Sequence, residues 1–304
     1  MHKGKVVATN GEAEIIECDF CGFKHLYPIP SKEEIKKYYE KQYYQEKKPK
    51  LLDYEKEVKE IKWLNLWHQD KLDILNNYIN DIGGNKRLLD VGCGNGLFLK
   101  FMEENGWETF GIEPSCTASE RANFLNTNVF NTTLEDFIEK KWYGYFDFIN
   151  LKCVLEHIPN PLEIITICKD LLNESGMICV EVPNDFNVLQ LQTHKNKICK
   201  SHYWLAIPDH INYFNFSSLT QLLDKCGFDI YLQTADFPME LFLLMEDNYI
   251  DNNEIGSKCH ERRMKFERNI DDRLRRNIYT SLAKLGIGRT CIIYAKLKNK
   301  GNEK

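Results

Sequence analysis

The stretch Leu88-Leu89-Asp90-Val91-Gly92-Cys93-Gly94-Asn95-Gly96 decides how this chain folds. Its apolar start predicts a strand over 87–91, and the residues after its last glycine predict a helix over 96–105. Glycine lets the backbone turn tightly and approach a ligand closely beside the N-terminus of a helix. The third glycine follows the second by two positions instead of three, so the stretch differs from the dinucleotide-binding fingerprint G-x-G-x-x-G.

Two carboxylates flank this turn. Asp90 lies directly before the first glycine, where it would repel a dinucleotide pyrophosphate and suits a ligand that carries a positive charge. Glu113 ends the next predicted strand, 21 positions after Gly92. A carboxylate at that place can accept hydrogen bonds from both hydroxyls of a ribose.

Short apolar runs alternate with helical runs beyond this stretch. Repeated β-α-β units with short connections build a parallel sheet with helices on both faces, so the predicted fold class is α/β, doubly wound and mostly parallel. A last strand over 289–298 follows a long helical excursion and is expected to lie antiparallel to 228–233 at the sheet end. The expected strands are 87–91, 108–112, 128–130, 146–151, 177–182 and 228–233, and the expected helices are 96–105, 115–126, 133–140, 161–172 and 217–225.

The same pattern divides the chain into four segments. The N-terminal cap contains two predicted strands, 14–17 and 23–27, around Cys18-x-x-Cys21, and a capping box at Ser31 and Glu34 starts a charged helical stretch. An irregular, aromatic connection from residue 186 to His210 follows the fifth core strand and the residues up to Asp185, and it is expected to bind the substrate. The segments are 1–82, the N-terminal knuckle and helical cap; 83–235, the core; 236–288, a helical insertion; and 289–304, the last strand and tail.

The net charge, the apolar runs and the cysteine content limit the classes of protein to which this chain can belong. The 304 residues carry 45 acidic and 40 basic side chains, a net charge of −5, which disfavours binding of nucleic acid through a broad basic surface. No stretch approaches the ~20 apolar residues that cross a bilayer, and the N-terminus lacks the apolar run of a signal peptide. The 11 cysteines are odd in number and scattered, as in a reduced protein. We therefore expect a cytoplasmic protein without nucleic-acid or membrane partners.

Four motifs in order resemble the class I S-adenosylmethionine-dependent methyltransferases: D-V-G-C-G-N-G at 90–96, G-I-E-P-S at 111–115, F-D-F-I-N at 146–150 and V-L-E-H-I-P-N-P at 154–161. The resemblance implies a Rossmann-like sheet and S-adenosylmethionine as cofactor. It implies that the loop over 132–135 lies near the adenine and that 150–152 lies under the sulfonium. The residues that it assigns to the cofactor are Asp90, Gly92, Cys93, Gly94, Gly96, Glu113, Pro114, Thr133, Leu134 and Lys152.

A narrower resemblance covers more of the chain. Cys18-x-x-Cys21-Gly22-Phe23 and the stretch 208–214 look like bacterial methyltransferases of small molecules and surface sugars. This resemblance implies O-methylation of a hydroxyl on a sugar, a sugar nucleotide or a related small metabolite, a form of carbohydrate modification. The alternatives are an RNA or protein methyltransferase and a non-catalytic scaffold with a methyltransferase-like fold.

Glu156, His157 and His210 are the candidate catalytic residues. Glu156 and His157 follow the fourth core strand, and an imidazole titrates near neutrality, so either histidine could take a proton from a substrate hydroxyl. The three residues could instead hold a divalent cation, although metal-using relatives have E-x-x-E-H and the first acidic position is Cys153 here. A third interpretation is that His157 caps the helix that begins near Pro161. These alternatives, and with them the need for a metal, stay open.

Cys18 and Cys21 have the spacing of a zinc knuckle, and His25 could supply a third ligand. A closed structural site needs four ligands, and the sequence contains no second C-x-x-C motif. The alternative is a tight turn with two reduced thiols. We therefore predict no bound metal at this turn, with zinc at these three residues as the less favoured outcome.

The helical insertion and the cap carry three further patterns. The arginines favour solvated helix faces with local ion pairs over a grip on a phosphate. The apolar stripe predicts a lid over the site or the seam of a homodimer, and the tyrosines either close over the cofactor or pack in the cap. The arginines are Arg262, Arg263, Arg268, Arg273, Arg275 and Arg276; the stripe is Phe237, Leu241, Phe242, Leu244 and Met245; and the tyrosines are Tyr38, Tyr39, Tyr43 and Tyr44.

Overall fold

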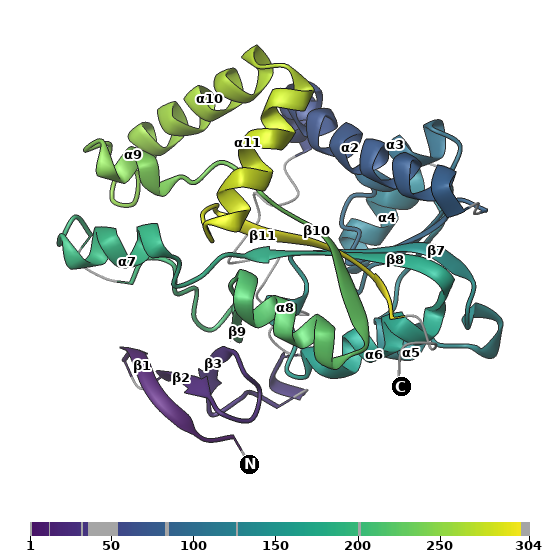
Figure 1. The fold of residues 1–304 in the computed structure, drawn as a ribbon, viewed down its shortest axis with the longest axis horizontal. Coiled ribbons are helices and arrows are strands. Elements are labelled where there is room, and N and C mark those ends of the chain that lie inside the picture. The colour runs from purple at the N-terminus through teal and green to yellow at the C-terminus, as the bar shows by residue number, and fades with distance from the viewer. Residues whose placement is uncertain are drawn as a thin grey trace.

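The computed structural model describes residues 2–11, 13–31, 33–35, 54–82, 85–125, 127–199 and 202–298. Its centre is a seven-stranded sheet with the order β10-β11-β8-β7-β4-β5-β6 (Figure 1). Its strands are β4 (Arg87–Val91), β5 (Glu108–Ile112), β6 (Val129–Phe130), β7 (Phe146–Lys152), β8 (Leu172–Pro183), β10 (Phe228–Ala235) and β11 (Thr290–Leu297). The four tyrosines between residues 38 and 44 lie outside the described residues.

The predicted α/β fold class is confirmed. β4 pairs in parallel with both β5 and β7, and β7 pairs in parallel with β8. β11 lies between β8 and β10 and is antiparallel to both, as expected for a strand that returns after the insertion. The chain runs outward from β4 to β5 and β6 on one side and to β7 and β8 on the other. The strand order therefore reverses between β4 and β7, and the carboxyl ends there form the crevice where such sheets bind ligands.

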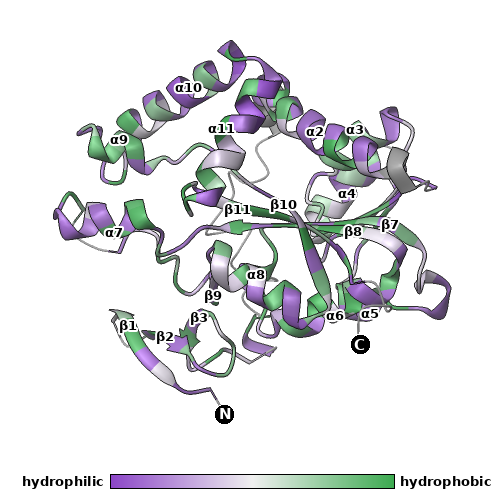
Figure 2. Ribbon diagram, in the orientation of Figure 1, coloured by the Kyte–Doolittle hydropathy of each residue, from purple (hydrophilic) through white to green (hydrophobic). Residues whose placement is uncertain are grey.

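Helices cover both faces of this sheet, as expected for strands that carry mostly hydrophobic residues (Figure 2). Consecutive residues of β7 show the alternation: Phe148 packs in the core on one face and Ile149 in the core on the other. The helices α2 (Tyr54–Ile82), α3 (Leu97–Glu104) and α4 (Cys116–Phe124) lie on the first face, and α5 (Leu134–Phe137), α6 (Pro161–Leu171) and α8 (Phe216–Lys225) on the second (Figure 1). Short 3-10 helices, η3 (Lys140–Trp142) and η4 (Leu155–His157), complete the connections.

A second, four-stranded sheet stands apart from the central one (Figure 1). It is antiparallel, with the order β1 (Gly4–Asn10), β2 (Ala13–Cys18), β3 (Lys24–Tyr27) and β9 (Asn212–Tyr213). The sequence predicted β2 and β3 but not β1, because an edge strand with charged neighbours lacks a clear apolar alternation. β9 comes from far along the chain and joins this small sheet to the core. The predicted capping box is present, with Glu34 accepting from both the backbone and the side chain of Ser31.

The connection after β8 differs from the expectation. It contains a helix, α7 (Val188–Lys195), whose start is fixed by a capping box between Asn187 and Gln190. The sequence missed this helix because its apolar residues Val188 and Leu191 are exposed instead of forming a buried stripe. The helix predicted over 133–140 is also shorter, since α5 ends at Phe137.

The insertion folds into α9 (Glu240–Leu244), α10 (Asn253–Asn269) and α11 (Asp272–Lys284), and α10 lies above the edge of the sheet beside α11 and α2 (Figure 1). Its apolar residues Met239 and Phe242 pack with Cys259 in a small core of their own. The division of the chain into four segments, and the choice between lid and dimer seam, stay predictions. No helix among the described residues combines the length and the apolar character that crossing a membrane requires.

Candidate active site

A cavity of about 570 Å³ opens at the carboxyl ends of β4, β5 and β7. Its walls come from the glycine turn, from β8, β10 and β11, from α2 and from the insertion. The side chains that line the cavity include Asp90, Cys93, Glu113, Asn150, Lys152, Cys153, Glu181, Trp63, Trp67, His68, Asp70, Lys71, Asp236, Arg263, Arg276, Tyr279 and Arg289. Both carboxylates singled out in the sequence thus lie in one cavity.

Two positions in the glycine turn beside the cavity require glycine, one for steric reasons and one for its backbone conformation. The backbone N–H of Gly92 donates to Ile112 O at 2.8 Å, and a Cβ at Gly92 would lie 2.8 Å from Val154 Cγ2. Gly94 has φ +54°, and a Cβ there would meet nothing within 4 Å. Gly92 therefore permits close packing behind the turn, whereas Gly94 holds a left-handed conformation on its open side.

Glu113 is fixed by the same turn. Its carboxylate accepts a hydrogen bond from the backbone N–H of Gly94 at 3.0 Å and another from Ser115 at 2.8 Å. Burial raises its pKa, while these two donors act in the opposite direction. A carboxylate held by backbone donors at the end of β5 is oriented before any ligand arrives.

Asp90 belongs to a buried polar network. Asn150 Nδ2 donates to Asp90 Oδ1 at 2.6 Å, and Lys71 Nζ donates to Asn150 Oδ1 at 2.7 Å. Lys71 and Lys152 each lie 3.4 Å from the carboxylate of Glu181. Burial raises the pKa of Asp90 to about 6, against the opposing effect of the Asn150 hydrogen bond. The network orders the floor of the cavity between β4 and β7.

Two residues of α2 were missed as site residues. Lys71 reaches the network from the buried face of the helix, and His68 lines the cavity beside it. Burial, reinforced by the positive charges of Lys152 and Lys71, lowers the pKa of His68 to about 3, so this imidazole is neutral at physiological pH. The sequence did contain one indication of this role, because Lys71 directly precedes Leu72 in a helix whose apolar residues recur at helical spacing.

The predicted cofactor residues fall into two groups. Those that line the cavity are Asp90, Gly92, Cys93, Gly94, Glu113 and Lys152. Gly96, Pro114, Thr133 and Leu134 are not among the described residues that line it. Thr133 caps α5 by accepting from Asp136 N at 3.3 Å, and Leu134 is buried in the core. Their role near the adenine stays a prediction.

The predicted catalytic residues are adjacent, although His210 is far from Glu156 and His157 in sequence. The imidazole rings of His157 and His210 have centroids 5.0 Å apart, and His157 Nε2 lies 3.9 Å from Glu156 Oε1. Asn212 holds the turn by donating to Leu155 O at 2.8 Å and to Ile158 O at 2.6 Å. One potential ligand atom from each of Glu156, His157 and His210 lies within 4.8 Å of the others, so the group could hold a metal ion.

His157 is oriented by the backbone. Its Nδ1 lies 2.8 Å from Asp209 O, and a carbonyl only accepts, so Nδ1 donates and Nε2 is the acceptor nitrogen of the neutral ring. The interpretation of His157 as the cap of α6 is wrong, because Asn160 accepts from Glu163 N at that helix start. The cluster lies beside the cavity: Cys153 lines it, whereas Glu156, His157 and His210 are not among its described lining residues.

Four of the six arginines of the insertion form ion pairs with described carboxylates, and two of these four are not solvated. Arg263 contacts Asp236 and Glu267, each at 3.1 Å, and Arg275 makes a two-point contact with Asp70 at 3.0 and 3.1 Å. Arg263 is 6% exposed and Arg275 is 0% exposed, which corrects the expectation of solvated faces. These buried pairs attach α10 and α11 to the central sheet and to α2.

The glycine turn, the acidic residue at the end of the second core strand and the order of motifs agree with one family of proteins. The family described as Methyltransferase domain matches residues 38–233 of the chain. The chain belongs to this family. Its seven-stranded sheet has the Rossmann-like methyltransferase arrangement, and its cavity lies where such sheets bind ligands.

Curated relatives match this methyltransferase over part of their length. A ubiquinone biosynthesis O-methyltransferase of Glaesserella parasuis serovar 5 is 33% identical over 134 residues, 41% of the chain and 56% of the relative. The protein of that name from Actinobacillus pleuropneumoniae serotype 5b is 36% identical over 127 residues, 39% of the chain and 54% of the relative. The chain thus spans about half the length of these relatives.

Solved structures share the fold at lower identity. The plantazolicin methyltransferase BamL, in complex with a triazolic desmethylPZN analogue and SAH, is 14% identical with a TM-score of 0.52, over 84% of this chain and 93% of that one. The plantazolicin methyltransferase BpumL, in complex with SAH, is 16% identical with a TM-score of 0.51, over 88% of this chain and 98% of that one. These similarities concern the fold alone.

Proposed function

We propose that this chain transfers a methyl group from S-adenosylmethionine to a hydroxyl of a small acceptor. The observation that carries the proposal is the meeting of Asp90, Glu113 and the open turn at Gly94 in one cavity. Glu113, held by two backbone donors, suits the hydroxyls of the ribose, and Asp90 suits the positively charged end of the cofactor. S-adenosylmethionine supplies a methyl group already activated by its positively charged sulfur.

The remaining work of the chain is to hold the acceptor and to remove its proton. Holding an acceptor oxygen in line with a methyl group accounts for much of the acceleration in such reactions. His157 accepts the hydroxyl proton at Nε2, because its Nδ1 is committed to Asp209 O. His210 and Glu156 lie beside it, with the two imidazole centroids 5.0 Å apart and Glu156 Oε1 3.9 Å from His157 Nε2. The names of the O-methyltransferase relatives support a hydroxyl as the acceptor group.

The acceptor is a sugar, a sugar nucleotide or a related small metabolite. Aromatic side chains in the cavity, Trp67 stacked on Tyr279 with ring centroids 5.4 Å apart among them, provide a flat surface for a ring. Arg289 also lines the cavity and makes no ion pair with a described carboxylate, so it suits a phosphate on the acceptor. Arg263 and Arg276, the arginines of α10 and α11 that line the cavity, do not serve this purpose, because their carboxylate partners neutralise them.

Calorimetric titration with S-adenosylhomocysteine tests the cofactor part of the proposal. We expect saturable binding by the wild type and at least a 10-fold loss of affinity in Asp90→Ala and Glu113→Gln, which remove the charges described above. The matched control Glu104→Gln changes an exposed carboxylate on α3 and keeps the affinity. Absence of binding by folded wild-type protein overturns the proposal and favours a scaffold.

Transfer of a labelled methyl group to a panel of sugars, sugar nucleotides and phenols tests the acceptor and the base. His157→Gln is expected to lose ~100-fold or more in kcat and to lose the fall in rate at acid pH, where an imidazole base is protonated. His260→Gln, on α10 and outside the described lining of the cavity, is the control and keeps wild-type rates. Loss of activity on metal removal, restored by a divalent cation, would replace the imidazole base with a metal at Glu156, His157 and His210.

A further inference from the structure

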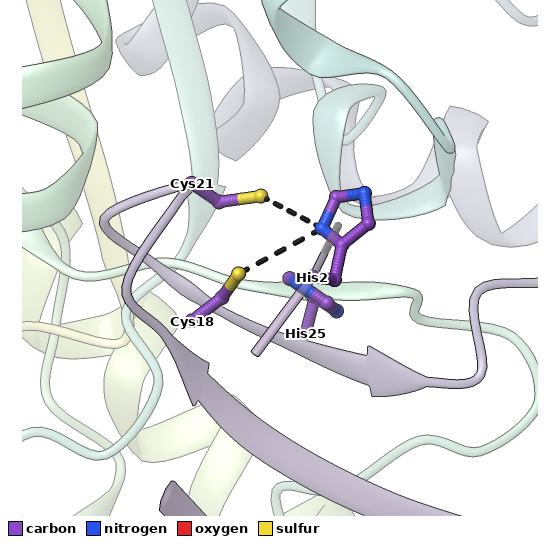
Figure 3. Close-up of side chains that lie close together, drawn as sticks. All are labelled: His2, Cys18, Cys21 and His25. Carbon is purple, nitrogen blue, oxygen red and sulfur yellow. Dashed lines mark hydrogen bonds between the residues drawn. The ribbon is translucent and has the colours of Figure 1, made fainter. Parts of the chain in front are cut away.

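Four side chains converge at the open end of the small N-terminal sheet (Figure 3). Cys18 ends β2, Cys21 lies in the turn, and His25 lies on β3, while His2 reaches the same place from the segment before β1. One ligand atom from each of the four lies within 4.8 Å of those of the others. The C-x-x-C motif and His25 provide only three ligands. The tertiary structure brings His2, which is distant in sequence, to the fourth position.

We propose that His2, Cys18, Cys21 and His25 bind a structural Zn²⁺ ion. Two thiolates and two imidazoles balance the charge of the ion and form one of the common ligand sets of structural zinc. A clustered set of soft sulfur and nitrogen donors, with no carboxylate among them, selects zinc over the oxygen-seeking cations calcium and magnesium.

The interatomic distances agree with a tetrahedral site. With Zn–S bonds of about 2.3 Å and Zn–N bonds of about 2.05 Å, the S···N edge of a tetrahedron is about 3.6 Å. His2 Nδ1 lies 3.3 Å from Cys21 Sγ and 3.7 Å from Cys18 Sγ, on either side of that value. Binding the ion therefore requires shifts of a few tenths of an ångström, together with loss of the thiol protons.

His25 provides an independent indication of a ligand. Its side chain is 0% exposed, and its Nε2 has no hydrogen-bond partner among the described residues. Its Nδ1 lies 2.8 Å from Leu26 O, a group that only accepts, so Nδ1 carries the proton and Nε2 presents a lone pair. An imidazole that donates one nitrogen to a backbone carbonyl and offers the other is the usual arrangement of a zinc-bound histidine. Without an ion, burial of this nitrogen costs free energy, because the hydrogen bond to water that it loses is not replaced.

The site also braces the candidate catalytic turn, a consequence that rests on the proposed function. His25 pairs directly with Asn212 between β3 and β9. The side chain of Asn212 holds the backbone of Leu155 and Ile158, on either side of Glu156 and His157. An ion that fixes His25 therefore restricts the motion of the turn that carries His157 and of β9, which directly follows the segment that carries His210.

Metal analysis of the full-length protein tests the proposal. We expect a single zinc ion per chain in protein purified without chelators, and its loss in Cys18→Ser, Cys21→Ser, His25→Gln and His2→Gln. Cys116→Ser changes an exposed cysteine on α4 and serves as the matched control that retains zinc. Full zinc content in the His2→Gln and His25→Gln variants would overturn this ligand set, and metal-free wild-type protein that fails to take up added zinc would overturn the site.

Cobalt substitution keeps the proposal testable if a variant fails to fold. Metal-free wild-type protein titrated with Co²⁺ is expected to develop the visible bands of a tetrahedral ion and the charge-transfer band of thiolate ligation, both displaced by added Zn²⁺. Octahedral spectra without a thiolate band would overturn the proposal. Affinity for S-adenosylhomocysteine, measured on the same metal-free sample, is expected to be unchanged, so failure of the zinc site and failure of the methyltransferase proposal are distinguishable.

Discussion

The side-chain amide of Asn150 donates a hydrogen bond of 2.6 Å to the carboxylate of Asp90, and this bond joins the ends of β7 and β4 at the floor of the cavity. The two residues are direct neighbours in the parallel register of these strands. Lys71 holds the other end of the amide. Because all three side chains are buried, each depends on the others for its hydrogen bonds.

Asn150→Ala removes the donor to Asp90 and the acceptor for Lys71 in one step. We expect the free energy of unfolding to fall by about 1–3 kcal/mol, the cost of leaving buried polar groups unpaired, and the affinity for S-adenosylhomocysteine to fall with it. Urea unfolding and calorimetric titration measure the two effects. Asn105→Ala, at an exposed side chain on the end of α3, is the control; a change in Asn150→Ala no larger than in this control would contradict the prediction.

Asp70→Ala removes the main partner of Arg275, which is fully buried between α11 and α2. Removing one member of a buried ion pair is expected to lower the free energy of unfolding by about 3–5 kcal/mol, because the other charge is left in the interior. Glu254→Ala breaks the exposed pair with Lys258 on α10 and is expected to cost less than ~0.5 kcal/mol. Equal unfolding midpoints in urea for the two variants would show that the buried pair does not secure the insertion.

Glu156 predicts a pH dependence of stability. Burial, with the negative charges of Glu181 and Asp209 nearby, raises its pKa from 4.5 to about 8. Between these values the folded protein keeps a proton that the unfolded chain has lost, so the free energy of unfolding falls as pH rises through this window. The contribution is fully present below the unfolded value and is lost above the folded one.

Glu156→Gln removes this titration, so its stability relative to the wild type is expected to rise between about pH 5 and about pH 8.5, by roughly 1–4 kcal/mol. Chemical unfolding at a series of pH values, with a chelator present, measures the difference. Glu104→Gln, at an exposed carboxylate, is the control and should follow the wild type at every pH. A constant difference between Glu156→Gln and the wild type would contradict the prediction.

Two glycines in contrasting surroundings test the packing behind the glycine turn. A Cβ at Gly111 in β5 would lie 2.6 Å from Leu99 Cδ1 and 2.7 Å from Cys93 Sγ, so Gly111→Ala is expected to cost about 1–3 kcal/mol by overpacking. A Cβ at Gly256 in α10 would meet no atom closer than 3.6 Å, so Gly256→Ala should stabilise the chain by about 0.4–1 kcal/mol. Thermal unfolding of both variants checks the opposite signs; a stabilised Gly111→Ala would refute the packing argument.

The positions of the core strands along the chain followed from local signals in the sequence. Apolar runs of strand length, a glycine turn after the first of them and acidic residues at the strand ends predicted a parallel sheet with Asp90 and Glu113 at one edge. Parallel strands are buried on both faces, so their residues are apolar throughout and stand out from the helices between them. The resemblance to methyltransferases rested on the same short segments.

The sequence by itself therefore determined the central sheet, the glycine turn and the two carboxylates, because these depend on neighbouring residues and on the twofold and 3.6-fold periods of strand and helix. Only the tertiary structure decided that His2 meets Cys18, that Arg275 is buried against Asp70, and that Lys71 supports Asp90 through Asn150. Each of these contacts joins residues far apart in the chain. The strength of these contacts depends on the exclusion of water around the paired charged and polar groups. That exclusion is set by the packing of whole elements, which no periodic pattern in the sequence records.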